Sequence, residues 1–251
     1  MKTALCLAGH FRHYPYCKIG LEKTIKKYNC DIFIHSYTTK SYLNDKRFNN
    51  FKDLVSEYSF SLTNTKKVVL EKEDEICDST LRSKENIASK LFLNNLTAAF
   101  LNQLKSLRKK NKVLELVDNS YDFIILTRPD CLIKEEINFN FNKLNLFCSK
   151  TEWLKTFLSE EKIITIEKQC IDKTSFCSNA ILRDDLIAGP AKIVKNIINK
   201  IYHNFGKTVK NNKVIFNPHK VLLAAVKEYE KEVFYNKNFF LLNTDDSLIY
   251  L

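Results

Sequence analysis

The sequence predicts an α/β fold in which a mostly parallel central sheet is flanked by helices. Two short apolar runs, TALCLAG at 3–9 and CDIFIHSY at 30–37, are typical of buried parallel strands. Between them, residues 18–28 carry apolar side chains among lysines at helical spacing. A third apolar run, YDFIILT at 121–127, follows a long segment of helical periodicity. Strand, helix and strand within about 35 residues form a βαβ unit.

The remaining elements follow in order. Residues 38–85 are polar, with one strand expected at KKVVLE, 66–71. A long helix is expected over 86–117, because leucines and a phenylalanine recur there at spacings of three and four. Its cationic residues suit the negative C-terminal end of a helix: they are Lys105, Arg108, Lys109 and Lys110.

Beyond the strand expected at 121–127 the pattern is less regular. A strand is expected at KIITIE, 162–167, and a final strand close to the end of the chain. One helix is expected to begin near Ala191, after a proline that fits a first helical turn, and another to cover 218–230. There is no internal repeat or low-complexity linker, so we expect one domain.

The charge balance raises the question of whether the protein binds polyanions. The formal net charge is +11, which would attract nucleic acid or an anionic membrane. The cations are mostly lysine, 34 of 40, and they are spread along the chain as on a solvated surface. The bulk charge therefore indicates at most a peripheral membrane contact, and we do not expect nucleic acid as the partner.

The eight cysteines contain no CxxC pair, and several lie inside apolar runs. This pattern favours reduced, mostly buried thiols over a disulfide framework or a zinc site. The apolar run at the start is too short for a signal peptide or a membrane span. We therefore expect a cytoplasmic protein.

The end of the strand expected at 121–127 carries the first candidate site. In open α/β sheets ligands bind beyond the carboxyl ends of the strands, and here Arg128, Pro129 and Asp130 follow the run. Asp130 could ligate a divalent cation that holds a diphosphate, and Arg128 could pair with a phosphate or orient Asp130. The alternative is a salt-bridged loop that only closes the strand.

Four motifs in order resemble a known family. They are ALCLAGHFR, CDIFIHSY, YDFIILTRPDCLI and DDLIAG at 184–189. Together they resemble small GT-A-type glycosyltransferases of bacterial surface-polysaccharide loci and large DNA viruses. In that family the RPD element stands where related enzymes carry a D-x-D metal motif. The resemblance implies a Rossmann-like domain over 1–251, with a nucleotide-sugar-binding half (1–135) and an acceptor-side half (136–251).

The resemblance also implies a ligand set. The donor would be a UDP-, GDP- or dTDP-sugar, and the acceptor a glycan or a lipid-linked glycan. Asp130 matches the final Asp of the motif, expected to meet Mn²⁺ or Mg²⁺ that bridges the donor diphosphate. Arg128 stands in the place of the first Asp, which leaves one carboxylate in the motif.

The loop after the first strand is the second candidate. Ala8, Gly9, His10 and Arg12 lie where this fold cradles a base, ribose or phosphate; glycine permits close backbone approach and arginine reaches an anion. The alternative is a tight loop with a surface arginine. His35 ends the second strand, and if the sheet is parallel it shares an edge with Gly9; it is either a ligand-binding or a core histidine.

Asp184 and Asp185 are the candidates for the catalytic base that removes the acceptor hydroxyl proton, with Asp185 preferred. They could instead cap the helix that follows. His219 could be a metal or diphosphate ligand, or a surface residue at a helix start.

Asn86 and Lys90, at the start of the long helix, could touch the nucleotide or lie on a solvated face. Two other functions compete with glycosyl transfer: a basic nucleic-acid-binding protein without catalysis, and a nucleotidyltransferase on a similar sheet.

Overall fold

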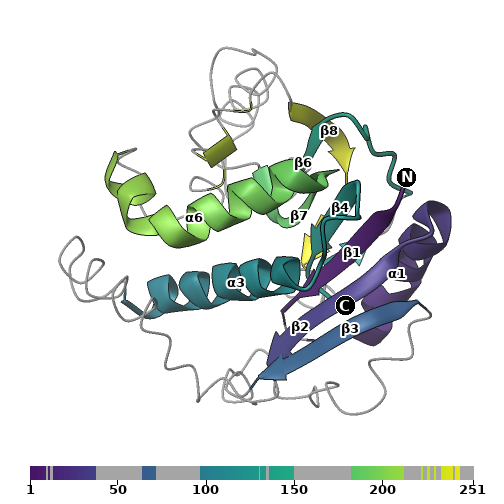
Figure 1. Cartoon of the computed structure of the whole chain (residues 1–251), viewed down its shortest axis with the longest axis horizontal. Coiled ribbons are helices and arrows are strands. Elements are labelled where there is room, and N and C mark those ends of the chain that lie inside the picture. The colour runs from purple at the N-terminus through teal and green to yellow at the C-terminus, as the bar shows by residue number, and fades with distance from the viewer. Residues whose placement is uncertain are drawn as a thin grey trace, which may run out of the picture.

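A computed structural model describes the sheet, three of its helices and several connections. The residues it describes are 1–9, 11, 14–37, 64–71, 97–129, 131–133, 136–149, 182–211, 222, 225–226, 229, 233–239 and 241–243. Figure 1 shows two long helices that lie next to the strands of the sheet.

The N-terminal βαβ unit is confirmed. Strand β1 (Thr3–Ala8) and strand β2 (Asp31–Tyr37) are parallel neighbours joined through helix α1 (Tyr14–Tyr28). The helix begins four residues before the expected start at 18, since Pro15 suits a first helical turn, where no backbone N–H is needed. It ends at Tyr28, and the next residue, Asn29, has a positive φ of 47°, which is common directly after a helix.

The next strand and the long helix are also found. Strand β3 (Thr65–Glu71) lies beside β2 at the edge of the sheet. Helix α3 (Thr97–Glu115) leads to strand β4 (Phe123–Thr127), which pairs with β1 in parallel. The expected helix start at 86 falls outside the described residues.

The second half of the sheet contains a strand that the sequence did not predict. Strand β7 (Leu182–Pro190) covers the DDLIAG segment and pairs antiparallel with β4. Strand β6 (Leu144–Ser149) lies antiparallel to β7, and strand β8 (Val233–Phe239) is parallel to β6. The order is β3-β2-β1-β4-β7-β6-β8, so the sheet is mixed but mostly parallel.

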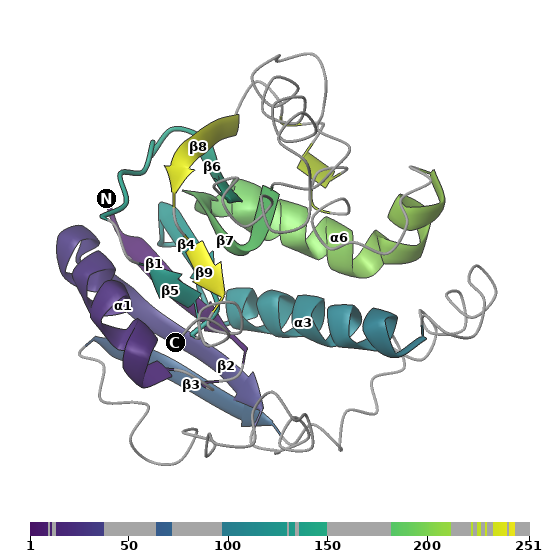
Figure 2. The ribbon, with the colours of Figure 1, turned by 180° about the vertical axis from the view of Figure 1, so that it is seen from behind.

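Two elements complete the described fold. Helix α6 (Ala191–Asn211) begins directly after β7, as expected for a helix starting near Ala191. Strand β5 (Cys131–Ile133) pairs antiparallel with strand β9 (Leu241–Asn243) in a small ribbon near α1 (Figure 2). Of the helix expected over 218–230, Leu222 and 225–226 are helical and buried; the expected strand at 162–167 lies outside the described residues.

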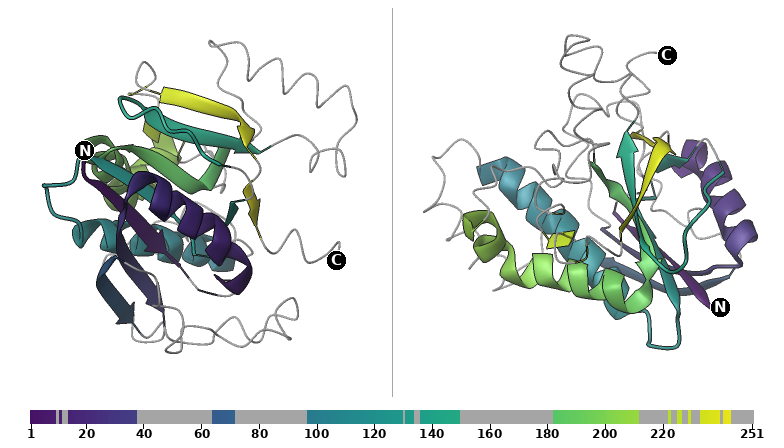
Figure 3. Two further views of the ribbon diagram at one scale, coloured as in Figure 1. Left: turned by 90° about the vertical axis from the view of Figure 1, so that its right-hand side faces the viewer. Right: turned by 90° about the horizontal axis from the view of Figure 1, so that it is seen from above.

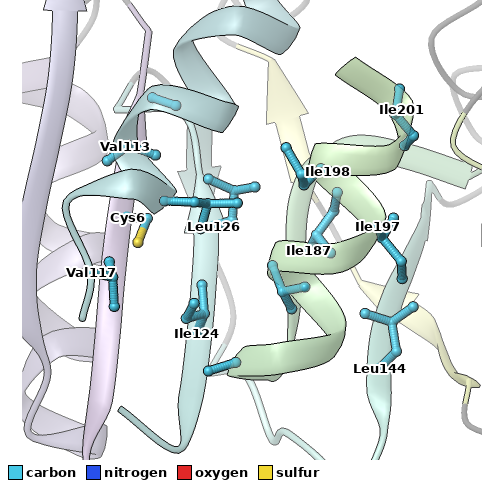
Figure 4. Close-up of a cluster of buried hydrophobic side chains, with 14 of the residues drawn as sticks. Cys6, Val113, Val117, Ile124, Leu126, Leu144, Ile187, Ile197, Ile198 and Ile201 are labelled. Atoms are coloured by element: carbon cyan, nitrogen blue, oxygen red, sulfur yellow. The ribbon is translucent and has the colours of Figure 1, made fainter. Parts of the chain in front are cut away.

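The sheet is covered on both faces, which gives two buried clusters. Helices α3 and α6 lie side by side over one face, and α1 covers the other (Figure 3). Alternate residues of each strand serve the two clusters, as the pleat requires: Cys6 and Leu126 pack against α3 and α6 (Figure 4), whereas Leu5 and Ile125 pack toward α1. This agrees with the α/β class that the sequence predicts.

Cys6, Cys17, Cys30 and Cys131 are buried and carry reduced thiols, as the cysteine pattern indicates. Burial raises the pKa of the Cys30 thiol to about 12, with a smaller contribution from Asp31, so this thiol stays protonated at neutral pH. Among the described helices, none combines the length and the apolar character that crossing a membrane requires.

Candidate functional site

Four parallel strands end at one edge of the sheet. Ala8 of β1 pairs with His35 of β2, Leu7 pairs with Thr127 of β4, and Tyr37 at the end of β2 pairs with Glu71 at the end of β3. We call this the carboxyl edge. The common edge expected for the ends of the strands predicted at 3–9, 30–37 and 121–127 is therefore confirmed, whereas the binding roles of the residues there stay predictions.

The strand order marks one point on this edge. From β1 the chain proceeds outward to β2 and β3, and it then returns to place β4 on the other side of β1. Neighbouring loops that lead away in opposite directions leave a crevice between them, and ligands of open α/β sheets bind at this switch point. The residues that follow β1 and β4 are Gly9 and Arg128, both candidates from the sequence.

Gly9 lies in close contact with the segment that follows β4. Its φ is +139°, a conformation that residues with a side chain rarely adopt. Its backbone N–H donates a 3.1 Å hydrogen bond to the carbonyl of His35. A Cβ at Gly9 would stand 3.7 Å from Cδ of Pro129 and 3.8 Å from Cγ of Arg128. Glycine is therefore required for the backbone conformation rather than for space.

A turn carries the chain from β4 into β5. The backbone N–H of Cys131 donates to the carbonyl of Arg128 at 3.2 Å, which closes a four-residue turn with Pro129 in its second position. Proline favours that position because its fixed φ matches the turn. Arg128 is half-buried, and Thr127 before it is buried. Asp130 lies outside the described residues, so its predicted role as a metal ligand is untested.

The reversed strand β7 brings the acidic pair to the same place. Because β7 is antiparallel to β4, Leu186 pairs with Thr127, and Asp185 is the next residue of β7 beyond this pair. On the other side, β6 pairs Leu146 with Ile187 and then Phe147 with Arg183, so β7 bulges over 184–186. Such bulges re-aim side chains and are common next to active sites.

The alternative reading of Asp184 and Asp185 as helix caps is wrong. Helix α6 begins at Ala191, after the whole of β7, and a capping side chain must stand next to the first turn. The backbone N–H of Ala191 instead donates to the carbonyl of Asp122 at 2.9 Å. The proposed role as a catalytic base stays a prediction.

His35 belongs to a buried charged network. Its side chain is 1% exposed, and Nε2 lies 3.4 Å from Oε1 of Glu71 at the end of β3. Arg108 of α3 donates from both terminal nitrogens to the two carboxylate oxygens of Glu71, and the Nη2 contact measures 3.4 Å. The network thus joins β2, β3 and α3 at the carboxyl edge.

The charge states in this network follow from burial and pairing. Burial lowers the pKa of His35; Glu71 opposes this effect, whereas the cations Arg108 and Lys109 add to it. Burial would raise the pKa of the Glu71 carboxyl, but the hydrogen bond from Arg108, together with the charge of that guanidinium, holds it below its usual value. The arrangement favours a carboxylate held by a guanidinium, beside a neutral imidazole.

The sequence did not predict the ion pair between Glu71 and Arg108. Glu71 ends a predicted strand, and this position at the carboxyl edge was the available signal. The assignment of the cations at 105–110 to the helix C-terminus is wrong, because α3 continues to Glu115 and the dipole effect fades beyond the last turn. Arg108 instead pairs with Glu71.

Several other sequence candidates lie outside the described residues, namely His10, Arg12, Asn86, Lys90 and His219. In the described part of the chain, no three His, Cys, Asp or Glu side chains are grouped as a metal ion would need. The described donor set at the switch point contains a cation, Arg128, and does not by itself fit a divalent metal.

Comparison of the sequence with protein-family models finds no matching family, and comparison with curated proteins finds no match. The geometry of the carboxyl edge is therefore the basis for assigning a function.

Proposed function

We propose that this protein is a glycosyltransferase with a GT-A-like domain, which moves a sugar from a nucleoside-diphosphate sugar to a glycan or a lipid-linked acceptor. One observation carries the proposal: the loop after β1 meets the turn after β4 at the switch point of a mostly parallel sheet. Such a point is where α/β proteins bind nucleotides. The reaction, transfer of a sugar, is proposed from the four ordered motifs of the sequence, which resemble those of small GT-A-type glycosyltransferases.

The donor would lie across the switch point. The positive φ of Gly9 sets the direction of the backbone after β1, and Arg128 supplies a planar cation suited to phosphate oxygens. The neighbouring Ala8, His10 and Arg12 would complete the contacts to the nucleotide. Neutralising the departing diphosphate lowers the barrier, because negative charge develops on it as the bond to the sugar breaks.

The acceptor hydroxyl would be activated from the β7 side. If the transfer inverts the anomeric centre, the acceptor oxygen attacks C1 while a carboxylate takes its proton. Asp185 lies in the bulge next to the end of β4, one residue beyond the pair Leu186–Thr127. It is therefore our candidate for the base, ahead of Asp184.

The resemblance also implies a divalent cation, Mn²⁺ or Mg²⁺. Asp130 is the first candidate for its ligand and His219 the second. When bound, such an ion would supply positive charge to the diphosphate. Because the described residues do not make a metal cluster, no step is derived through the ion, and Asp130 is tested directly.

The test combines donor binding with turnover. The melting temperature of the purified protein is measured with UDP-, GDP- and dTDP-sugars in Mn²⁺, and release of the nucleoside diphosphate is followed in parallel. We expect one donor to raise the melting temperature, and Asp130→Asn to remove both the shift and the release. Asp185→Asn should keep the shift and slow release by about 10²–10⁴-fold, the usual loss of a general base.

A control separates these effects from loss of charge alone. Glu22→Gln removes the same charge from an exposed face of α1, where Glu22 pairs with Lys18 at 3.5 Å, and it should leave binding and release unchanged. Absence of a shift with every donor would contradict the proposed function. Unchanged release in Asp185→Asn would remove only the assignment of the base.

A further inference from the structure

A fully buried amide, Asn145, stands at the start of strand β6, opposite Ala188 of β7. Its Oδ1 accepts the backbone N–H of Asn140 at 2.8 Å, and its Nδ2 donates to the Asn140 carbonyl at 2.8 Å. Nδ2 also donates to the carbonyl of Lys143 at 2.8 Å and to that of Ala188 at 3.4 Å. One side chain therefore binds both the turn before β6 and the neighbouring strand β7.

The backbone of β7 approaches the start of β6 closely at Gly189. A Cβ at Gly189 would stand 3.1 Å from the Cα of Leu144 and 3.3 Å from the carbonyl oxygen of Lys143. Glycine inside a strand often marks such a close approach of another backbone. Asn145 and Gly189 thus hold the start of β6 at one place along β7.

The apolar pattern of β6 does not by itself select this place. Leu144 and Leu146 are buried in the cluster on the side of α3 and α6, which also contains Ile187 of β7 (Figure 4). A slip of β6 by one residue would turn both leucines to the other face of the sheet. A slip by two residues keeps the faces and places one leucine where the other stood. The hydrogen bonds of Asn145 distinguish these two registers, because an amide needs its partners at defined positions.

The register of β6 determines where the bulge of β7 lies. The β6–β7 ladder breaks after the pair Leu146–Ile187 and skips 184–186 before it resumes. A two-residue slip of β6 would move this break by two residues along β7. Asp185 would then pair with β6, and it would no longer lie in the bulge beside the end of β4.

We propose that Asn145 is a positioning residue for Asp185. It fixes the register of β6 on β7, and this register keeps the bulge that contains Asp185 next to the end of β4. The proposal rests on the proposed function, in which Asp185 is the base. It also gives the glycine of DDLIAG, Gly189, a part in the same placement.

The test measures donor binding and turnover in Asn145→Ala. The shift in melting temperature caused by the donor should persist, because β6 is not a neighbour of β1 or β4. Release of the nucleoside diphosphate should slow by roughly 10²-fold, the loss that a misplacement of about 1 Å can cause. In Asp185→Asn the same substitution should cause no further slowing, since its effect passes through Asp185.

Two further variants support this comparison. Gly189→Ala disturbs the same contact by a different route and should give the same pattern, which keeps the test decisive if Asn145→Ala does not fold. Asn142→Ala is the matched control, because Asn142 lies exposed on the same turn and the substitution retains its backbone hydrogen bond to Oδ1 of Asn140. It should leave binding and release unchanged.

Equal slowing by Asn145→Ala in the parent protein and in Asp185→Asn would overturn the proposal, as would loss of the donor shift, since the amide would then serve stability alone. Amide hydrogen exchange over 182–187 tests the register without any reaction, and it should become faster in Asn145→Ala while β1 stays protected. If the parent protein turns over no donor, the proposed function fails and exchange decides: faster exchange confined to 182–187 supports the role of Asn145, and unchanged exchange overturns it.

Discussion

Replacement of Gly20 by alanine tests how closely α1 packs on the small ribbon beside the site. A Cβ at Gly20 would stand 2.2 Å from the carbonyl oxygen of Ile133 and 3.0 Å from its Cβ. Helix α1 or strand β5 must therefore move by roughly 1 Å to restore a normal contact. The obstacle is backbone, so no side-chain rotation relieves it.

Two opposing terms decide the sign of this effect. Alanine inside a helix is favoured over glycine by about 1 kcal/mol. Overpacking costs about 1–3 kcal/mol, and contact with a fixed carbonyl belongs at the upper end, near 3 kcal/mol. The net loss in the free energy of unfolding is therefore about 2 kcal/mol, which lowers the melting temperature by roughly 4–8 °C for a chain of this size.

Urea unfolding and thermal melts of the Gly20→Ala protein measure this loss. Ile19→Ala is the matched control, because Ile19 is 64% exposed on the same helix and its replacement makes no new contact. Its stability should stay unchanged or rise slightly. A Gly20→Ala protein as stable as the parent would contradict the close contact between Gly20 of α1 and the Ile133 carbonyl of β5.

The remaining predictions concern the buried network. Glu71→Gln and Arg108→Met should each lower the free energy of unfolding by about 2 kcal/mol, which is less than the full cost of breaking a buried pair because Glu71 retains some exposure. In urea unfolding, the double variant should lose less stability than the sum of the two single losses. Additive losses would argue against a coupled pair. The pKa of His35 is lower in the folded state than in the unfolded chain, so the unfolded chain binds the extra proton and stability falls as the pH drops below about 6.5. The lowered pKa of Glu71 adds a second loss below about pH 4.5. His35→Gln should flatten the first decline, measured by melts across pH, whereas His203→Gln on the exposed face of α6 should retain it; an unchanged slope in His35→Gln would exclude His35 as its source.

The sequence predicted the strands and helices whose signals are local. The runs that became β1, β2 and β4 are short and apolar, and their ends carry Gly9, His35 and Arg128 to one edge, as expected for parallel strands. Because strands joined by a helical crossover pair in parallel, their carboxyl ends meet at one edge, and this edge could be predicted without knowing the long-range contacts.

The sequence did not reveal features that depend on distant partners. The segment 182–190 contains charges, a glycine and a proline, and only its pairing with β4 makes it a strand. Glu71 and Arg108 are 37 residues apart, so no local pattern in the sequence indicates that they form an ion pair. The end of the long helix was predicted within two residues, at 117 against Glu115, but the assignment of the cations at 105–110 to that end was wrong, because helical spacing does not show a partner such as Glu71 that lies across space from Arg108.

The pairing of β5 with β9 has a consequence for the order in which the protein can be completed. The turn at Arg128 leads directly into β5, and the partner of β5 is supplied by 241–243, more than a hundred residues later in synthesis. Strands β1 to β4 can pair with one another as soon as the first half has left the ribosome, because the pairings of β1 with β2 and β4, and of β2 with β3, lie within it. The four parallel strands that form the carboxyl edge are therefore available early in synthesis, whereas the β5–β9 ribbon that follows the turn at Arg128 is completed only after 241–243 has been made.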